Sequence, residues 1–242
     1  MAASTNSCPG AGPPTQADPQ VKPPRACWPR LLSFSTAVDI TVARGAIVHP
    51  FPFSDQRAAQ QEAARLGATL AHPRNAAGGQ YSLSPASLAT IPRGTRLLLP
   101  SPNGSRLSVA AAGTRRRIPV LAGCLRNARA VAAAARRLAG TGAVGVIPAG
   151  ELWPDGGLRP AIEDLLGAGA IIEHLGGEAS PEAEVARDAW RAAGHRLGRM
   201  IRLCTSGQEL VSRGYSGDVD LALEEDASAT APVLRDGAYR AA

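Results

Sequence analysis

The sequence predicts an α/β protein, with a three-layer α/β/α fold built around a largely parallel sheet. Short apolar runs bounded by Gly or Pro alternate with Ala-rich segments of helical period, the pattern of strands joined by crossover helices. No internal repeat is evident. With 45% hydrophobic residues in a chain of 242, there is enough apolar material for a substantial core.

The N-terminal segment differs in composition from the rest of the chain. Residues 1–30 contain seven prolines and almost no aliphatic residues. We therefore expect a Pro-rich segment over residues 1–30 that is disordered or non-native, followed by one α/β domain over residues 31–242.

Five strands and four well-bounded helices are predicted along this domain. The strands are short and mostly end at Gly or Pro: Ala46–Val48, Ala68–Ala71, Thr95–Leu99, Pro119–Ala122 and Ala143–Ile147. The helices begin at Ser, Asn or Thr caps and mostly end at Gly. They are Asp55–Leu66 capped by Ser54, Ala128–Ala139 capped by Asn127, a helix from Ser180-Pro181 to Ala193, and a shorter one from Thr205 or Ser206 to near Gly214.

Rare residues exclude several chemistries. Lys22 is the single lysine, and it lies in the Pro-rich segment, which excludes a Walker A loop, protein-kinase chemistry and a lysine Schiff base. The four cysteines show no CxxC spacing and the four histidines form no HExxH motif, so a transition-metal enzyme is not supported. We expect any bound metal to be a hard ion held by carboxylates.

The net charge of +6 is unevenly distributed. Residues 1–150 carry 17 basic and 4 acidic residues, whereas residues 151–242 carry 9 basic and 16 acidic ones. The basic half favours an anionic ligand, and the acidic half could supply carboxylates to Mg²⁺. A solvated surface whose composition drifts along the chain is the alternative interpretation.

The same features bound the choice of partners. No basic helix and only nine aromatic residues are available for a base-stacking surface, so nucleic acid is not an expected partner. No apolar run reaches the ~18 residues that cross a bilayer, and the first residues do not resemble a secretory signal. We therefore expect a cytoplasmic protein without a membrane partner, and homo-oligomerisation is left open.

Four strand-to-helix turns are rich in Ser, Thr, Asn and Gly. They lie at residues 33–36, 100–105, 123–127 and 148–151. In open α/β sheets the ligand lies beyond the carboxyl ends of the strands, where helix N-termini present unpaired N–H groups suited to phosphate or carboxylate. Each turn alone is a weak signal because such residues cap helices everywhere, but four together favour an anion site.

Carboxylates accompany the last of these turns. Glu151 stands at a strand end, and Glu163 and Asp164 follow Pro160 in the first turn of a helix. They could simply complement the helix dipole. Alternatively, Glu151 and one of the pair reach a Mg²⁺ ion that bridges to the phosphate. The spacing does not decide between the two.

Four ordered motifs carry a family resemblance. GTRLLLPSPNGSRL, VLAGCLRNARAVA, IPAGELWPDGGLRPAIEDLLGAGAI and SGQELVSRGYSGDVDLALEEDASATAPVL resemble the 2-phosphosulfolactate phosphatase family, over a stretch from about Leu32 to the end. The resemblance implies an α/β/α fold and a Mg²⁺-dependent phosphatase. The family's reaction converts 2-phosphosulfolactate, a small anionic phosphate ester, to sulfolactate and phosphate in coenzyme M biosynthesis.

The resemblance also implies roles for particular residues. Glu151 and Asp164 are implied as catalytic, and Glu151, Glu163 and Asp164 as metal ligands. The implied binders of phosphate or substrate are Ser35, Thr36, Asn103, Gly104, Ser105 and Asn127, with Arg126 and Arg159 for a second anionic group. Without a Cys-x₅-Arg motif or a haloacid-dehalogenase signature, direct attack by a Mg²⁺-associated water is the simplest mechanism. Asp218 is a candidate for an additional acid, but a cap on a surface helix is the expected role.

The match departs from the family before the first turn. The family carries a buried strand with an Asp there, but this chain has Arg30 at the position of the Asp and Pro29 beside it, so no core strand is expected. One hypothesis is that the residues before Leu31 are not the natural ones, through a frameshift or a wrong start. The other is a catalytically impaired relative that binds a phosphate ligand or nucleic acid.

Overall fold

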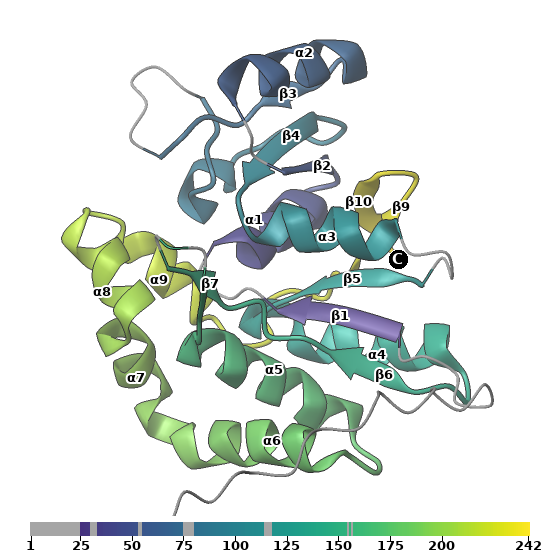
Figure 1. The fold of residues 1–242 in the computed structure, drawn as a ribbon, viewed down its shortest axis with the longest axis vertical. Coiled ribbons are helices and arrows are strands. Elements are labelled where there is room, and N and C mark those ends of the chain that lie inside the picture. The colour runs from purple at the N-terminus through teal and green to yellow at the C-terminus, as the bar shows by residue number, and fades with distance from the viewer. Residues whose placement is uncertain are drawn as a thin grey trace, which may run out of the picture.

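The main sheet has eight strands and is mixed. The computed structural model describes residues 25–29, 33–52, 55–74, 80–113, 118–153, 155 and 157–242 (Figure 1). Within these residues the strand order is β3-β4-β2-β10-β9-β5-β1-β6. The strands are β1 Arg25–Pro29, β2 Ile47–Pro52, β3 Thr69–Leu70, β4 Arg96–Ser101, β5 Val120–Gly123, β6 Val144–Val146, β9 Pro232–Arg235 and β10 Ala238–Ala241. The predicted α/β class is confirmed, and the five predicted strands correspond to β2 to β6.

Strand β1 corrects the prediction that no core strand precedes the first turn. Its backbone lies between β5 and β6, parallel to both, with Trp28 opposite Ala122 and Arg25 opposite Val144. Pro29 is the last residue of the strand, so its missing N–H interrupts the ladder only at the end. Arg30 and residues 1–24 lie outside the described residues, and the domain boundary at residue 30 stays a prediction.

A C-terminal hairpin, which the sequence analysis missed, joins two sets of parallel strands. Asp236 and Gly237, at φ 50° and 75°, form the turn between β9 and β10, the Asp-Gly combination typical of tight hairpins. Strand β10 is antiparallel to β9 and β2, and β9 is antiparallel to β5. The strands of the set β3-β4-β2 therefore point in the opposite direction to those of the set β5-β1-β6.

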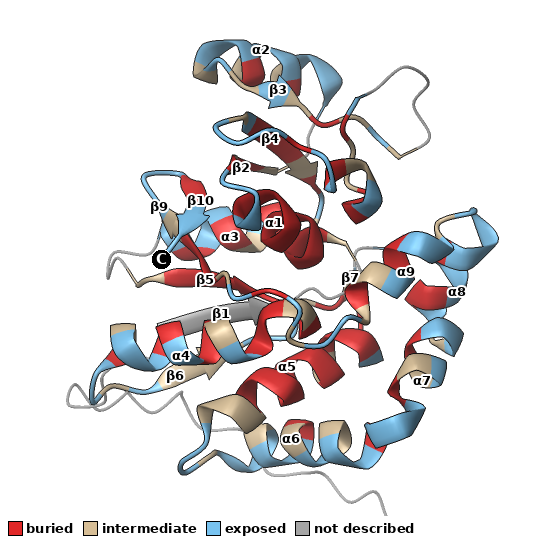
Figure 2. Cartoon of the chain, turned by 180° about the vertical axis from the view of Figure 1, so that it is seen from behind, coloured by how far each residue is buried: buried red, intermediate tan, exposed pale blue. Residues whose placement is uncertain are grey.

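Helices α1 (Phe34–Ala43) and α3 (Gly104–Ala112) lie between these two sets (Figure 1). Nine of the ten residues of α1 are buried, which makes it one of the most enclosed elements in Figure 2. Leu97 and Leu99 of β4 join the cluster around α1, whereas Leu98 points to the other face and contacts helix α2 (Gln56–Leu66). This alternation places helices on both faces of the sheet, as the three-layer prediction requires.

The remaining helices pack mainly on the other half of the sheet. Helices α4, α5 and α6 contact one another in sequence, and α7 to α9 lead the chain back to the hairpin (Figure 1). Their bounds are α4 Ala128–Ala139, α5 Ile162–Leu175, α6 Pro181–Ala193, α7 Leu197–Leu203, α8 Thr205–Ser212 and α9 Ser216–Ala222, and a small hairpin pairs β7 Glu151–Leu152 with β8 Leu158–Arg159. None of the helices in the described ranges combines the length and apolar character of a membrane span.

The predicted helix caps are only partly confirmed. Ser180 accepts a hydrogen bond from Ala183 N and caps α6 as expected. Helix α2 is capped by Asp55, which accepts from Ala58 N at 2.7 Å, while Ser54 lies outside the described residues. Asn127 precedes α4 but does not cap it with its side chain.

A buried histidine in β2 predicts a pH dependence of stability. His49 is 6% exposed and its Nε2 has no hydrogen-bond partner, and burial lowers the pKa of His49 below 6.5, with Arg96 and Arg240 adding to the effect. As the pH falls, His49 in the unfolded chain is therefore protonated at a higher pH than His49 in the folded protein. The neutral imidazole lets the folded state keep its full stability above about pH 6.5, and this stability is lost as the pH falls through the lower pKa of the folded state.

We expect the urea midpoint of the wild type to fall between about pH 7.5 and pH 5.5. The fall should be shallower in His49→Gln, because that variant has no proton to take up at this position. Urea unfolding of both proteins at the two pH values measures the difference, and parallel pH dependences would contradict it.

Candidate active site

The helices that follow β1 and β4 touch at their N-termini. A Cβ at Gly104, the first residue of α3, would lie 2.4 Å from the side chain of Phe34, the first residue of α1. The turn after β6 joins them, since Asn103 Nδ2 donates to Glu151 Oε2 at 2.7 Å. The turns were expected to meet because parallel strands end at one edge. In the structure, the two sets of parallel strands run in opposite directions, and α1 and α3 contact strands of both sets (Figure 1). The turns therefore meet at the N-termini of these helices.

A cavity of about 230 Å³, here called the inner chamber, opens beside this junction. The three acidic residues singled out from the sequence, Glu151, Glu163 and Asp164, all line it. They come from β7 and from the first turn of α5. The other polar residues of its lining are Ser33, Arg74, Ser206, Glu209 and Arg213.

Both acidic residues of α5 are buried and held in place. Asp164 is 2% exposed and accepts a hydrogen bond from Gly150 N at 2.9 Å. Glu163 is 4% exposed and accepts from Cys204 Sγ at 3.4 Å. Burial and the neighbouring Glu163 raise the pKa of the Cys204 thiol to about 12, so that thiol remains a donor. Both acids thus lie near the positive end of the helix dipole and also line the chamber.

The charge of the inner chamber favours a cation. Four carboxylates, from Glu151, Glu163, Asp164 and Glu209, outnumber the two guanidinium groups of Arg74 and Arg213 in its lining. An anion alone would meet net repulsion there. In the described part of the chain, no three His, Cys, Asp or Glu side chains lie close enough to cage a metal by themselves. Carboxylate oxygens with room for water and substrate fit Mg²⁺, which is commonly held by one or two carboxylates.

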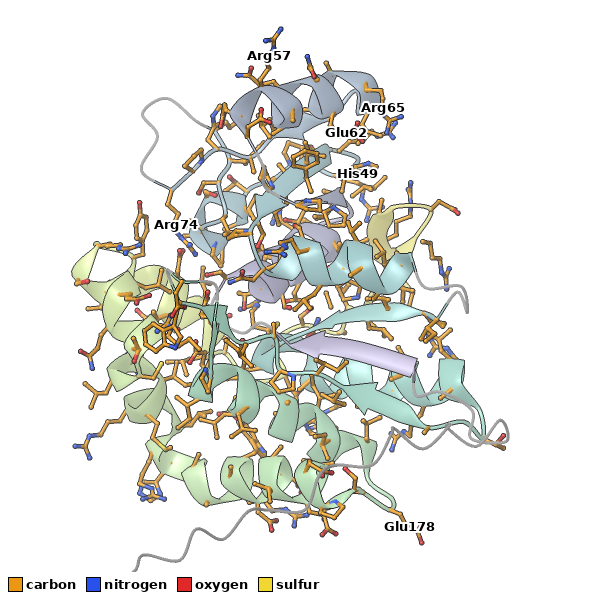
Figure 3. All side chains as sticks on the ribbon, in the orientation of Figure 1. His49, Arg57, Glu62, Arg65, Arg74 and Glu178 are labelled. Carbon is orange, nitrogen blue, oxygen red and sulfur yellow. The ribbon has the colours of Figure 1, made fainter. Side chains whose placement is uncertain are left out.

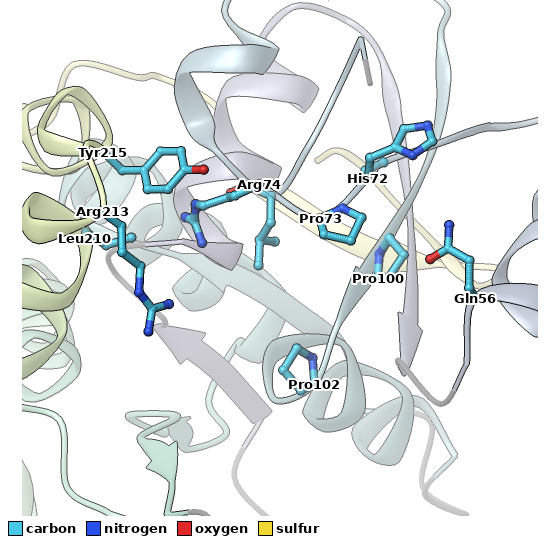
Figure 4. A pocket seen from close by; sticks show the side chains of 11 residues that line it. Gln56, His72, Pro73, Arg74, Pro100, Pro102, Leu210, Arg213 and Tyr215 are labelled. Carbon is cyan, nitrogen blue, oxygen red and sulfur yellow. The ribbon is translucent and has the colours of Figure 1, made fainter. Parts of the chain in front are cut away.

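A second cavity of about 630 Å³, the outer chamber, adjoins the first (Figure 4). The two share Arg74, Arg213 and three apolar residues, and the rest of the outer lining includes Gln56, His72 and Tyr215. No carboxylate appears among the residues that the structure describes around the outer chamber.

Asp218 corrects a prediction of surface exposure. It is 1% exposed, because the first turn of α9 packs against the 3-10 turn Pro85–Leu88. Its carboxylate accepts from Ser84 Oγ at 2.5 Å, from Ala86 N at 3.2 Å and from Arg74 Nε at 3.2 Å. Asp218 therefore anchors Arg74 at the boundary of the two chambers.

Several predicted phosphate binders are buried next to the site. They are not among the residues that the structure describes around either chamber. Ser35 and Thr36 lie in the first turn of α1 with exposures of 1% and 0%. Ser105 is fully buried and donates to Leu99 O at 3.0 Å. Asn103 and Gly104 lie at the junction itself, as described above. Their roles in binding stay predictions.

The polar side chains of the turn after β5 bind other groups of the protein. Asn127 accepts from Cys124 N at 2.9 Å and donates to Ala122 O at 3.3 Å, which closes the turn. Arg126 pairs with Asp39 at 3.1 Å and with Glu224. Burial raises the pKa of Asp39, and Arg126 partly offsets that effect. In this geometry Arg126 links α1 to the segment after α9 and lines neither chamber.

Arg159 lies beside the inner chamber. Its guanidinium lies 5.5 Å from the centre of the Trp153 ring, 3.4 Å from Ser206 Oγ and 3.5 Å from Glu209 Oε2. Since Ser206 and Glu209 both line the inner chamber, Arg159 supports that wall.

Four lining residues were not anticipated: Arg74, Ser206, Glu209 and Arg213, whereas Ser33 belongs to the first of the turns that were expected to meet an anion. Ser206, Glu209 and Arg213 come from α8 and its end, which follow another helix rather than a strand. The rule that ligands lie at strand ends therefore does not point to them. The small-residue run Thr205-Ser206-Gly207 at the start of α8 is the signal that could have done so.

Together these features define a class of protein: an α/β protein with an acidic cavity at helix N-termini, suited to a hard cation and an oxyanion. The chain belongs to the 2-phosphosulpholactate phosphatase family, whose profile matches residues 36–237. It is also similar to the 2-phosphosulfolactate phosphatase of Methanothermobacter thermautotrophicus, with 34% identity over 145 residues, 60% of this chain. The matched region spans 58% of that relative's length, less than two thirds.

Proposed function

We propose that this protein is a Mg²⁺-dependent phosphatase that hydrolyses a small phosphate monoester, 2-phosphosulfolactate, to sulfolactate and phosphate. The observation that carries the proposal is the inner chamber, which Glu151, Glu163 and Asp164 line together with Ser33 and Ser206. Family membership and the similar phosphatase support the same reaction. A cytoplasmic location, a place in coenzyme M biosynthesis and homo-oligomerisation stay predictions.

Glu151, together with Glu163 or Asp164, would hold the Mg²⁺ ion. Bound there, Mg²⁺ would supply positive charge to the phosphoryl group and acidify a bound water. The chain fixes these carboxylates in advance, since Asn103 Nδ2 donates to Glu151 and the Gly150 N–H donates to Asp164. Pre-oriented carboxylates need no rearrangement when the ester arrives.

The hydroxyl and guanidinium groups of the inner chamber would orient the phosphoryl oxygens. Arg74 donates to Ser33 Oγ at 3.0 Å, and Arg159 reaches Ser206 Oγ at 3.4 Å, so each hydroxyl is positioned by an arginine. Phosphoryl transfer depends mainly on positioning and charge stabilisation, which such groups provide. We assign Glu151 or Asp164 to take the proton of the attacking water and to return a proton to the oxygen of the leaving sulfolactate.

Phosphate release from 2-phosphosulfolactate, with Mg²⁺ and after chelation, tests the proposal. We expect turnover that disappears with the chelator and returns when Mg²⁺ is added back. Turnover that is indifferent to Mg²⁺ would contradict the role of the metal. Ligand binding without any phosphate release would instead favour the impaired relative described above.

A further inference from the structure

The two chambers differ in the charge of their walls. The inner chamber has an excess of carboxylates, whereas the outer chamber carries Arg74 and Arg213 with no acidic side chain in its described lining. An ester with a second acidic group would therefore favour one orientation. Its phosphate would lie with the cation in the inner chamber, and its other acidic group would lie in the outer one.

The sizes of the chambers agree with this division. The inner chamber, at about 230 Å³, is smaller than the ~300 Å³ at which small-molecule sites usually begin. The outer chamber adds about 630 Å³ and shares Arg74, Arg213, Leu83, Pro102 and Leu210 with it. A substrate larger than its phosphoryl group can thus extend from one into the other.

The two shared arginines are not equivalent. Arg74 is tied to the buried Asp218 at 3.2 Å and lies over the Tyr215 ring at 5.6 Å, so its charge is already compensated. Arg213 follows the last turn of α8 and is exposed, and no carboxylate pairs with it in the part of the chain that the structure describes. Figure 4 shows its side chain on the α8 side of the cavity, facing away from the body of that helix.

We propose that Arg213 is a specificity residue that binds the second acidic group of the substrate, a sulfonate or a carboxylate. This inference rests on the proposed phosphatase function. Guanidinium groups form strong charge-assisted hydrogen bonds with such oxyanions. The family resemblance implied this role for Arg126 and Arg159. Arg126 is already paired with Asp39 and Glu224. Arg159 is paired with Glu209, so we assign the role to Arg213.

The test compares three esters in the wild type and in Arg213→Gln. 2-Phosphosulfolactate carries both extra acidic groups, 2-phospholactate lacks the sulfonate, and p-nitrophenyl phosphate lacks both. Loss of a hydrogen-bonded charge pair should lower the selectivity for 2-phosphosulfolactate over p-nitrophenyl phosphate, as a ratio of kcat/KM values, by about 10- to 100-fold, mainly through KM. Hydrolysis of 2-phospholactate shows which acidic group Arg213 binds. If Arg213 binds the carboxylate, Arg213→Gln should also lower the selectivity for 2-phospholactate over p-nitrophenyl phosphate. If Arg213 binds the sulfonate, that selectivity should stay as in the wild type.

Arg213→Lys, which keeps the charge, should recover part of the selectivity. Arg199→Gln is the matched control, because Arg199 is an exposed arginine of α7 outside both chambers, and it should leave the ratio unchanged. An unchanged ratio in Arg213→Gln, or an equal loss for all three esters, would overturn the proposal.

If the wild type hydrolyses none of the esters, the proposed function fails, and binding then decides the role of Arg213. Calorimetric titration of sulfolactate into the wild type and Arg213→Gln provides that measurement. Weaker binding by the variant supports the role of Arg213, and equal binding or no binding to either protein overturns it.

Discussion

Glu151→Gln is expected to lower Mg²⁺-dependent phosphate release by on the order of 10²-fold. The substitution keeps the size of the side chain and removes the charge that lies at the meeting point of the turns after β4 and β6. It also turns the acceptor of the Asn103 Nδ2 hydrogen bond into an amide, which is a weaker ligand for Mg²⁺. Phosphate release measured over a range of Mg²⁺ concentrations should show a lower maximum and a higher Mg²⁺ requirement.

Glu178→Gln is the matched control, since Glu178 is exposed and lies far from the chambers, near the start of α6 (Figure 3). It removes the same charge from the surface and should leave phosphate release as in the wild type. Full activity in Glu151→Gln would remove both the metal role and the catalytic role of Glu151.

Among the strands predicted from the sequence, β4 and β5 carry uninterrupted apolar runs that are buried, whereas β3 and β6 are at most half-buried. In β4, Leu97, Leu98 and Leu99 are all at most 1% exposed, and an uninterrupted apolar run of this kind is what a strand covered on both faces produces. The C-terminal hairpin was missed although Asp236-Gly237 is a turn signal, because Arg235 and Arg240 interrupt the apolar pattern of its two strands. Their pairing with β2 and β5 joins residues far apart in the sequence, which no local pattern reveals.

The carboxylates that line the inner chamber could be predicted from the sequence, whereas most of the hydroxyl and guanidinium groups beside them could not. Glu151, Glu163 and Asp164 stand out as acids at a strand end and a helix start, and the inner chamber brings them together. Asn127 shows why the turn residues were harder to interpret. An amide in a strand-to-helix turn can serve a ligand or the turn's own backbone, and here it bonds Cys124 N and Ala122 O.

Gly207→Ala is expected to destabilise the protein and to disturb the inner chamber. A Cβ at Gly207 would lie 1.9 Å from the carbonyl oxygen of Ile201 and 3.0 Å from that of Arg202, at the tight corner between α7 and α8. Neither backbone carbonyl can rotate away as a flexible side chain would, so α8 must shift. Overpacking of this kind costs about 3 kcal/mol. For a chain of this size that corresponds to a Tm lower by roughly 6–12 °C in a thermal melt.

The shift would also reach the site, because α8 carries Ser206 and Glu209 into the inner chamber. Phosphate release by the folded fraction should therefore fall together with the melting temperature. Gly217→Ala is the control, since a Cβ at that helical position of α9 would meet nothing within 4 Å. It should be neutral or stabilising by up to ~1 kcal/mol, as expected for Gly replaced by Ala in a helix. A Gly207→Ala protein as stable as Gly217→Ala would mean that the α7–α8 corner can open without cost, and α8 could then not hold its residues rigidly against the carboxylates.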